Sequence, residues 1–419
     1  MELKPGYKQT EVGVIPDDRD VDVLANVCSK ITDGTHDTPR PIETGIPFLT
    51  AIHVKENKID FDGCYYLPQN IHDEIYRRCN PEKDDVLMVN IGAGVATTAL
   101  VDVNYEFSLK NVALLKPQKS KLIGTYLNHY QSFVKRKITG SISTGGAQPF
   151  LSLSQIGQLK IAIPASKAEQ TAIANALSDA DALIQSLTSL IAKKRQIKQG
   201  AMQTLLNPYE NGQLKVGWVV KKMSEVCWFQ EGPGVRNSQF TRSGVKLLNG
   251  TNIDQGELFL EKTDRYISEK EAHGWYSHFL ADEGDIIIAY SGITVEKFHE
   301  KVTVLRKEHL PLCMNTSTMR FKVTSKELQH SYLKHFLRSK VFKGQIGGKA
   351  TGSAQLNFGP SHVNAVEMAL PPINEQTHIA AILSGMDAEI AALEAKLAKY
   401  RHIKQGMMQN LLTGRIRLI

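Results

Sequence analysis

The sequence is poor in cysteine and has no long apolar run. Its five cysteines are scattered, and no two of them form a Cys-x-x-Cys pair. They are Cys28, Cys64, Cys79, Cys227 and Cys313. This spacing argues against a disulfide framework or a zinc site and favours reduced thiols in the cytoplasm. The longest apolar runs, residues 285–290 and 217–220, are far shorter than the roughly 20 residues that span a bilayer. The first residues carry no apolar signal segment, so we expect neither secretion nor a membrane anchor.

Positive and negative charges are also nearly balanced. The chain has 50 Lys and Arg residues against 43 Asp and Glu residues, which gives a net charge of +7 over 419 residues. This excess permits a polyanionic partner such as nucleic acid without requiring one. The hydrophobic fraction of 42% and the charged fraction of 22% are typical of a globular protein, and the length predicts two or three domains.

Catalytic and cofactor motifs are missing as well. The sequence has no Asn/Asp-Pro-Pro-aromatic loop of an amino-methyltransferase and no phosphate-binding Gly-x-x-x-x-Gly-Lys-Ser/Thr loop. Residues 92–97 match only Gly-x-Gly-x-x-Thr, which predicts a tight turn. No two histidines stand in a His-x-x-x-His pair, so we expect no bound metal. These absences favour a protein that binds no cofactor and does no chemistry itself.

What the sequence does contain is a strong internal repeat. Residues 169–206 align with residues 375–412 at an offset of 206, and 22 of the 38 aligned positions are identical. Just upstream, Thr-Gly-Gly-Ala-Gln at 144–148 matches Thr-Gly-Ser-Ala-Gln at 351–355. The repeat therefore describes one structural unit used twice in the chain.

Each repeated segment follows a larger and more divergent region, which we call the first head (residues 20–165) and the second head (residues 217–371). Buried strands are predicted at 86–92 and 286–292, where β-branched apolar runs end at glycine. Short helices are predicted at 123–130 and 332–338. We therefore expect two heads of one mixed α and β fold with different surfaces.

The repeated segments themselves have the heptad pattern of a coiled coil. The first seam consists of Ile173, Leu177, Ala180, Ile184, Leu187, Ile191, Lys194, Lys198, Ala201 and Leu205. The second consists of Ile379, Leu383, Met386, Ile390, Leu393, Leu397, Tyr400, Lys404, Met407 and Leu411. Two unrelated amphipathic helices, each packed on its own head, remain an alternative, but the shared seam favours a pair.

Two copies of one unit imply a pseudo-twofold axis, and two helices that share a seam across that axis run antiparallel. A helix of about 37 residues is ~55 Å long, so it would act as a ruler between the heads. Because the heads differ in sequence, we expect a split, asymmetric DNA site with a spacer of fixed length.

The chain resembles the specificity subunit of type I restriction-modification enzymes over essentially its whole length. The resemblance rests on the duplicated helices, on the opening Tyr-Lys-Gln-Thr-Glu-Val-Gly-Val-Ile-Pro at 7–16, and on the ending Leu-Leu-Thr-Gly-Arg-Ile-Arg at 411–417. It implies that each head is a target recognition domain that reads half of a bipartite double-stranded DNA site. It also implies that the helices dock two methyltransferase subunits, that restriction subunits join this core, and that S-adenosylmethionine, ATP and Mg²⁺ bind on those partners.

The predicted fold is therefore α+β, with an intramolecular coiled coil. We place the first recognition domain at 1–165 and the first conserved helix at 166–207, followed by the second domain at 208–371 and the second helix at 372–419. Two other functions stay open: a coiled-coil interaction scaffold without sequence-specific DNA binding, and a self-contained DNA-modifying enzyme. The scaffold would show no sequence preference for DNA, and the enzyme would transfer methyl groups alone.

Candidate DNA contacts follow from residue type. Phosphate contacts need cations or backbone N–H groups, and base reading needs forked or planar side chains. For contacts near phosphates we select Lys135, Arg136, Lys137, Ser143, Thr144 and Gln148, and in the second copy Lys343, Lys349, Thr351 and Gln355. For base reading, which should lie where the copies differ, we select Thr35, His36, Arg40, Arg236, Asn237 and Gln239. Ordinary surface loops are the alternative for each set.

Candidate contacts with a methyltransferase subunit lie at the ends of the helices. A charged residue in the seam weakens a two-stranded coiled coil, so it fixes the register or marks where partner helices join. Flexible methionine beside polar groups suits a partner surface. The candidates are Lys198, Gln199, Met202, Lys404, Gln405 and Met408. Packing within the chain itself is the alternative, and the run Lys193–Arg195 is expected to be a solvated face.

Overall fold

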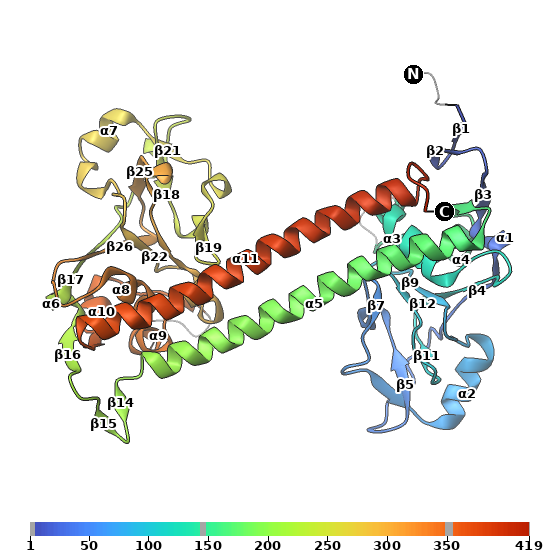
Figure 1. Ribbon diagram of the computed structural model, residues 1–419, viewed down its shortest axis with the longest axis horizontal. Helices are drawn as coiled ribbons and strands as arrows, with labels where there is room; N and C mark the ends of the chain where they lie inside the picture. Colours follow the sequence, from blue (N-terminus) through green and yellow to red (C-terminus); the bar gives the residue numbers. More distant parts are fainter. Residues whose placement is uncertain (1–4, 143–147, 348–354, 419) are drawn as a thin grey trace. The chain divides into compact units, whose positions relative to one another are not determined.

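The structure is a computed structural model that describes residues 5–142, 148–347 and 355–418. The chain divides into two compact units: unit 1 comprises residues 1–188 and 395–419, and unit 2 comprises residues 189–394. Each unit contains one head and half of each long helix (Figure 1). Within the described residues, no helix has the length and apolar character needed to cross a membrane.

The first head is built on an antiparallel sheet of four strands in the order β10-β9-β12-β4. These strands are β4 (Cys28–Asp33), β9 (Val86–Val89), β10 (Thr98–Leu100) and β12 (Val112–Pro117). A smaller sheet has the order β11-β5-β8, with β11 parallel to β5. Its strands are β5 (Ile46–Leu49), β8 (Tyr65–Leu67) and β11 (Ser108–Leu109).

The residues of β9 are all apolar, without the alternation of apolar and polar residues that is typical of a strand with one face in water. All four of its residues are buried, because both faces of the sheet are covered. Val86 and Met88 belong to the core that includes α3 and the long helices, whereas Leu87 and Val89 belong to the core beneath the smaller sheet. The four-stranded sheet thus separates an inner core, next to the long helices, from an outer core.

The second head repeats this topology strand for strand. Its four-stranded sheet has the order β24-β22-β26-β17, and its smaller sheet has the order β25-β18-β21 with β25 parallel to β18. The strands are β17 (Cys227–Glu231), β18 (Val245–Leu248), β21 (Tyr266–Ile267), β22 (Ile286–Ala289), β24 (Val302–Val304), β25 (Leu312–Met314) and β26 (Thr318–Val323). The prediction of two mixed heads with one fold is confirmed.

Shorter elements complete each head. In the first they are α1 (Leu24–Val27), α2 (Gln69–Arg78), α3 (Gly124–Ser141), α4 (Leu153–Gly157), β1 (Tyr7–Thr10), β2 (Gly13–Pro16), β3 (Arg19–Val23), β6 (Val54–Lys55), β7 (Lys58–Ile59) and β13 (Lys160–Pro164). In the second they are α6 (Met223–Val226), α7 (Glu269–His273), α8 (His330–Leu337), α9 (Lys340–Gly347), α10 (Pro360–Asn364), β14 (Tyr209–Glu210), β15 (Gln213–Leu214), β16 (Val219–Lys222), β19 (Ile253–Asp254), β20 (Glu257–Leu258), β23 (Ile293–Thr294), β27 (Gln355–Leu356) and β28 (Glu367–Leu370).

The long helices α5 (Lys167–Leu205) and α11 (Ile373–Leu411) confirm the repeat-based prediction. Every residue of the two predicted seams is buried or half-buried. In unit 1, Asp181 of α5 pairs with Lys404 of α11, while Glu169 at the start of α5 pairs with Arg417 beyond the end of α11. The two helices therefore run antiparallel in this unit.

Unit 2 has the same arrangement of its two half-helices. Lys194 of α5 pairs with Glu389 of α11, and Lys198, one turn further along α5, pairs with Asp387, which lies earlier in α11. Sequence numbers that rise on one helix and fall on the other describe an antiparallel pair. Apolar contacts also join the helix ends to the head, because Leu205 and Leu383 belong to the same core.

A buried glutamine fixes the start of each long helix to its own head. The Gln170 side chain accepts a hydrogen bond from the Ile123 N–H at 3.1 Å and donates one to the Lys121 carbonyl at 3.0 Å. At the equivalent position, Gln376 accepts from the Gln329 N–H at 2.9 Å. Because both amides are buried and satisfied by the head backbone, each helix begins at a defined point of its head.

Candidate nucleic-acid interface

The predicted base-reading loop of the first head follows β4 at its outer end. The Thr35 N–H donates to the Leu109 carbonyl at 2.9 Å, which ties the loop to the end of β11. The His36 ring is hydrogen-bonded with the Asn111 side chain at 2.8 Å and lies 3.2 Å from Asp33. Arg40 is exposed. The loop is thus held at its base, and its tip is accessible to a ligand.

Two further cations, neither of them among the residues predicted from the sequence, contact this loop. Lys110 donates a hydrogen bond to the Thr38 hydroxyl, and Arg78 at the end of α2 pairs with Asp33. The Arg78 side chain is 54% exposed. We call His36, Arg78 and Lys110 the first basic surface. No local pattern predicts it, because its members come from three distant segments that meet only in the fold.

In the second head, the three predicted base-reading residues divide into two groups. Arg236 and Asn237 are exposed. The Gln239 side chain instead donates to Glu271 at 3.0 Å and accepts from the Arg236 N–H and from the Tyr276 hydroxyl. These contacts hold the loop against α7. A carbonyl oxygen accepts two hydrogen bonds, so the Gln239 amide oxygen is fully used within the head.

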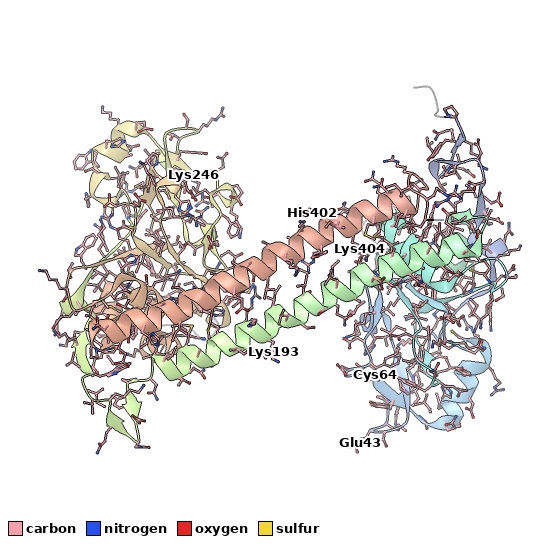
Figure 2. All side chains as sticks on the ribbon, in the orientation of Figure 1. Glu43, Cys64, Lys193, Lys246, His402 and Lys404 are labelled. Atoms are coloured by element: carbon pink, nitrogen blue, oxygen red, sulfur yellow. The ribbon has the colours of Figure 1, made fainter. Side chains whose placement is uncertain are left out.

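Next to that loop, cations lie over aromatic rings in and beside the smaller sheet of the second head. The Lys246 ammonium lies 4.9 Å from the centre of the Tyr266 ring, and the Arg265 guanidinium lies 5.3 Å from that of Phe240 (Figure 2 labels Lys246). Trp275, just beyond α7, is 86% exposed. Large aromatic side chains are seldom so accessible, and stacking on bases is one use for them. No motif or spacing in the sequence points to these residues.

Three of the candidate phosphate contacts of the first head, Lys135, Arg136 and Lys137, lie on α3. The short helix predicted at 123–130 was too short: α3 continues to Ser141, because Val134 and Ile138 keep packing on the inner core at helical spacing. Arg136 is exposed, and Lys135 lies 3.6 Å from Glu56. Lys137 donates to the Glu11 carbonyl at 3.2 Å.

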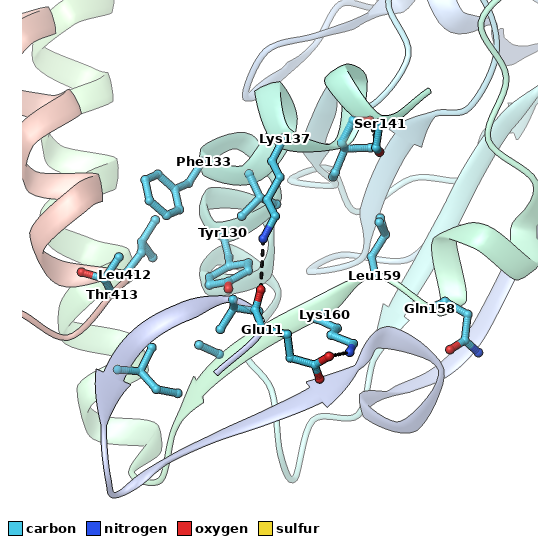
Figure 3. Close-up of a pocket in the computed structure, with 15 residues that line it drawn as sticks. Glu11, Tyr130, Phe133, Lys137, Ser141, Gln158, Leu159, Lys160, Leu412 and Thr413 are labelled. Carbon is cyan, nitrogen blue, oxygen red and sulfur yellow. Dashed lines mark hydrogen bonds and ion pairs between the residues drawn. The ribbon is translucent and has the colours of Figure 1, made fainter. Parts of the chain in front are cut away.

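Lys137 also lines a pocket of about 420 Å³ in unit 1 (Figure 3). Its walls come from β2, α3, β13 and the residues after α11, and include Ile15, Phe133 and Leu412. Glu11 and Lys160 form an ion pair at its edge. The lining is mostly apolar, and the ammonium groups of Lys137 and Lys160 already have partners within the chain. Such a pocket does not suit a phosphate, so we do not assign it to the nucleic-acid interface.

The remaining phosphate candidates are placed only in part. Gln148 is exposed, and Lys343 is half-buried on α9. Gln355 stands in β27, whose backbone pairs with β23. Ser143, Thr144, Lys349 and Thr351 lie outside the described residues. The candidate phosphate contacts therefore stay predictions.

The six candidate partner contacts on the helices differ in accessibility. Gln199 and Gln405 are exposed, whereas Met202 and Met408 are half-buried against the inner cores of their units. Lys198 and Lys404 lie in the seam and pair with Asp387 and Asp181 respectively, so both ammonium groups have a carboxylate partner within the chain. Burial lowers the pKa of Lys198 to about 8.

Each of these carboxylates lies beside a buried histidine of the head. His129 of α3 is hydrogen-bonded with Ser178 at 3.1 Å, and His335 of α8 with Ser384 at 3.0 Å. Burial lowers the pKa of His129 to about 4 and that of His335 to about 3. Both imidazoles are therefore neutral at neutral pH.

Serine, histidine and aspartate at one place are the residue types of a hydrolase triad, but this geometry is unsuited to catalysis. The His129 ring nitrogen lies 3.9 Å from Asp181, beyond hydrogen-bond distance, and Lys404 neutralises that carboxylate. The equivalent Asp387 pairs with both Lys198 and Arg338. Among the described residues there is also no cluster of side chains that could hold a metal ion.

Comparison with known proteins places both repeats in one family. A family model of the type I restriction modification DNA specificity domain matches residues 45–199 and again residues 215–400. The MjaVIII type I restriction enzyme specificity subunit of Methanocaldococcus jannaschii is 25% identical over 367 residues, which cover 84% of this chain and 85% of that protein. A putative MjaX specificity subunit from the same organism is 23% identical and covers 98% of this chain and 97% of its own length.

A solved structure has the same fold. The crystal structure of the type I restriction-modification S subunit from M. genitalium aligns with a TM-score of 0.61 at 14% sequence identity, over 98% of each chain. At this identity the likeness concerns the fold alone, and it covers both heads and both long helices.

Proposed function

This chain belongs to the type I restriction modification DNA specificity family, and we propose that it gives a methyltransferase and restriction complex its DNA sequence preference. The observation that carries this proposal is the presence of two heads with one topology and different sequences. Each head then reads one half of a bipartite, asymmetric site in double-stranded DNA. The first basic surface serves the first head, and the loop at 234–239 with the neighbouring Lys246 and Trp275 serves the second.

The proposed complex contains two methyltransferase subunits, one for each copy of the repeat. The exposed Gln199 and Gln405 mark equivalent places where such subunits would dock. Restriction subunits would join this core. We infer that this chain is not catalytic and binds no cofactor, and that S-adenosylmethionine, ATP and Mg²⁺ belong to the partners. A complex that acts on chromosomal DNA would work in the cytoplasm.

The spacer between the half-sites is attributed to the antiparallel helices. Each helix has 39 residues, which corresponds to a length of ~58 Å. Because each helix starts against one head and ends in the other unit, its length and register would set the separation of the half-sites. Reading of bases and measurement of the spacer are thus assigned to different parts of the chain.

An exchange of one head tests this proposal. Residues 20–165 are replaced by the corresponding region of another family member, and the chain is expressed with its methyltransferase subunits. Sequencing of modified bases in genomic DNA should show one new half-site, with the other half-site and the spacer unchanged. Changes in both half-sites, or no methylation that depends on this chain, would contradict the proposal. Methyl transfer by the purified chain alone would establish an enzyme instead.

A further inference from the structure

The same group of four polar residues occurs once in each unit, and it joins three elements there. We call these groups the junctions. The first junction consists of His129, Ser178, Asp181 and Lys404, and the second of His335, Ser384, Asp387 and Lys198. Each residue of one junction is 206 positions from its counterpart in the other. Each junction links a head helix, the long helix that follows that head, and the opposite long helix.

The chemistry of the junctions is unusual for a helix seam. An apolar residue at the position of Lys198 or Lys404 would stabilise the seam at least as well, because a buried ion pair seldom gains more than it loses in desolvation. The flanking seam residues, such as Ile191 and Leu397, are apolar and buried. Stability alone therefore does not account for a charged pair at the same place in both copies.

A largely buried lysine paired with a half-buried carboxylate does, however, favour one helix register over others. If α11 slides along α5 by one turn, about 5.4 Å, apolar residues still meet apolar residues. The Lys404 ammonium, whose side chain is only 13% exposed, would then lose its carboxylate partner, which costs more than a lost surface pair. A single polar residue in the seam of a coiled coil selects the register in the same way.

The junctions also hold each head against its helix pair. The Asp181 carboxylate accepts a hydrogen bond from the Asn57 amide at 3.3 Å, and Asn57 is itself hydrogen-bonded to Asn128 of α3. In unit 2, the Asp387 carboxylate accepts from Arg338, which follows α8, at 3.1 Å. A change in helix register would therefore also break contacts between the helices and the head.

We propose that the two junctions are positioning residues for the spacer: they lock the register of α5 against α11 and thereby set the number of base pairs between the half-sites. This inference rests on the proposed function. A slip of one turn to one heptad moves a helix by about 5 to 10 Å, which corresponds to one to three base pairs at about 3.4 Å each.

The test is a neutral-junction variant, Lys198→Met, Lys404→Met, Asp181→Asn and Asp387→Asn, expressed with the methyltransferase subunits. Modified bases in genomic DNA are sequenced. The half-sites should stay the same, while sites with spacers one to three base pairs shorter or longer should reach at least a tenth of the methylation of the parent site. In the unaltered complex such sites should stay unmethylated.

Two further variants separate a register lock from a structural role. The first variant keeps Lys198→Met and Asp387→Asn but exchanges the charges in unit 1, Asp181→Lys with Lys404→Asp. This exchange restores one pair to the neutral-junction variant and should restore the single parent spacer. The matched control is the pair Arg195 and Glu394, which lies on the same helices with side chains 55% and 38% exposed. The variant Arg195→Met with Glu394→Gln should keep the parent spacer.

The outcomes are distinguishable. Methylation by the neutral-junction variant at the parent spacer only would overturn the inference, because apolar packing would then fix the register. Loss of all methylation in a variant that still unfolds cooperatively would overturn it as well, since the junctions would be needed for assembly and not for spacing. If the unaltered complex methylates no bipartite site, the proposed function itself fails.

Discussion

At the residue scale, the two junction histidines combine complete burial with a neutral charge state, and this makes stability depend on pH. His129 and His335 have pKa values lowered to about 4 and about 3 in the fold, whereas an unfolded histidine titrates near 6.5. As the pH falls from about 6.5, the unfolded chain binds protons that the folded chain does not. The contribution of these two histidines to the free energy of unfolding is therefore fully present above about pH 6.5, and it is lost as the pH falls towards 4.

Replacement of both histidines should reduce this acid sensitivity. Between pH 7 and pH 5, each histidine is expected to remove about 2 kcal/mol from the free energy of unfolding. In the variant His129→Gln with His335→Gln, the difference in stability between these pH values should shrink accordingly. Urea unfolding at both pH values measures it. His273→Gln is the control, because this ring is 62% exposed, and an equal effect there would contradict the assignment.

Lys110 offers a residue-scale test of the first basic surface. If its ammonium contacts a DNA phosphate, Lys110→Ala should weaken DNA binding by the complex at low salt. It should also reduce the slope of log affinity against log salt concentration by about 1. Filter binding or fluorescence anisotropy at several salt concentrations measures both. Lys193→Ala is the matched control, since this lysine is on the exposed side of α5 (Figure 2). Equal slopes for the two variants would remove Lys110 from the interface.

Residue type alone predicted only part of the candidate interface. Arg40 and Arg236 were selected from the sequence and are accessible, but Gln239 was selected as a planar reader and is occupied by Glu271 and Tyr276. Arg78 was not predicted, because it belongs to a helix that is far along the sequence from the loop it contacts in the fold. Which polar side chain is available for a ligand depends on neighbours that only the fold supplies.

At the scale of elements, the long helices were the most predictable part of the chain. A heptad pattern is a local property, so the seams from Ile173 to Leu205 and from Ile379 to Leu411 could be identified without any tertiary information. The end of α3 could not. Its last turns carry Lys135 to Ser141, a polar stretch that is helical because Ile138 is buried in the inner core.

The helices also permit a test of the spacer at this scale. Insertion of seven residues after Ser189 and seven after Ala395, at equivalent positions of the repeat, keeps the heptad pattern and lengthens both helices by about 10.5 Å. The spacer of the methylated site should grow by about three base pairs, with both half-sites unchanged. Sequencing of modified bases reads this directly.

A loop insertion provides the control for that experiment. Seven residues placed between Asn211 and Gly212, in the turn between β14 and β15, leave both helices at their original length. The spacer should then stay the same. If both insertions changed the spacer, or neither did, the separation of the half-sites would not depend on helix length.

At the scale of the whole molecule, unit 1 is assembled from segments almost 400 residues apart. The buried Arg19 donates to the Leu412 carbonyl and to Glu169, both at 2.8 Å, and Arg417 pairs with the same Glu169 at 2.7 Å. Gly414 has a φ of +75°, and a Cβ there would lie 2.6 Å from Pro16. In unit 2, the continuous residues 206–219 connect α5 to the second head. The corresponding part of unit 1 is formed by two separate segments, the first residues of the chain and the residues that follow α11. In unit 2 it is one continuous segment.

The sequence by itself determined the repeat, the two long helices with their seams, and the mixed α and β character of both heads, because these follow from local periodicity and from identity at a fixed offset. Only the tertiary structure decided which side chains meet. Lys404 pairs with Asp181 beside His129, and Arg78 and Lys110 contact the loop after β4. Both arrangements depend on contacts between segments far apart in the chain. Burial and pairing are properties of those contacts, and no local pattern encodes them.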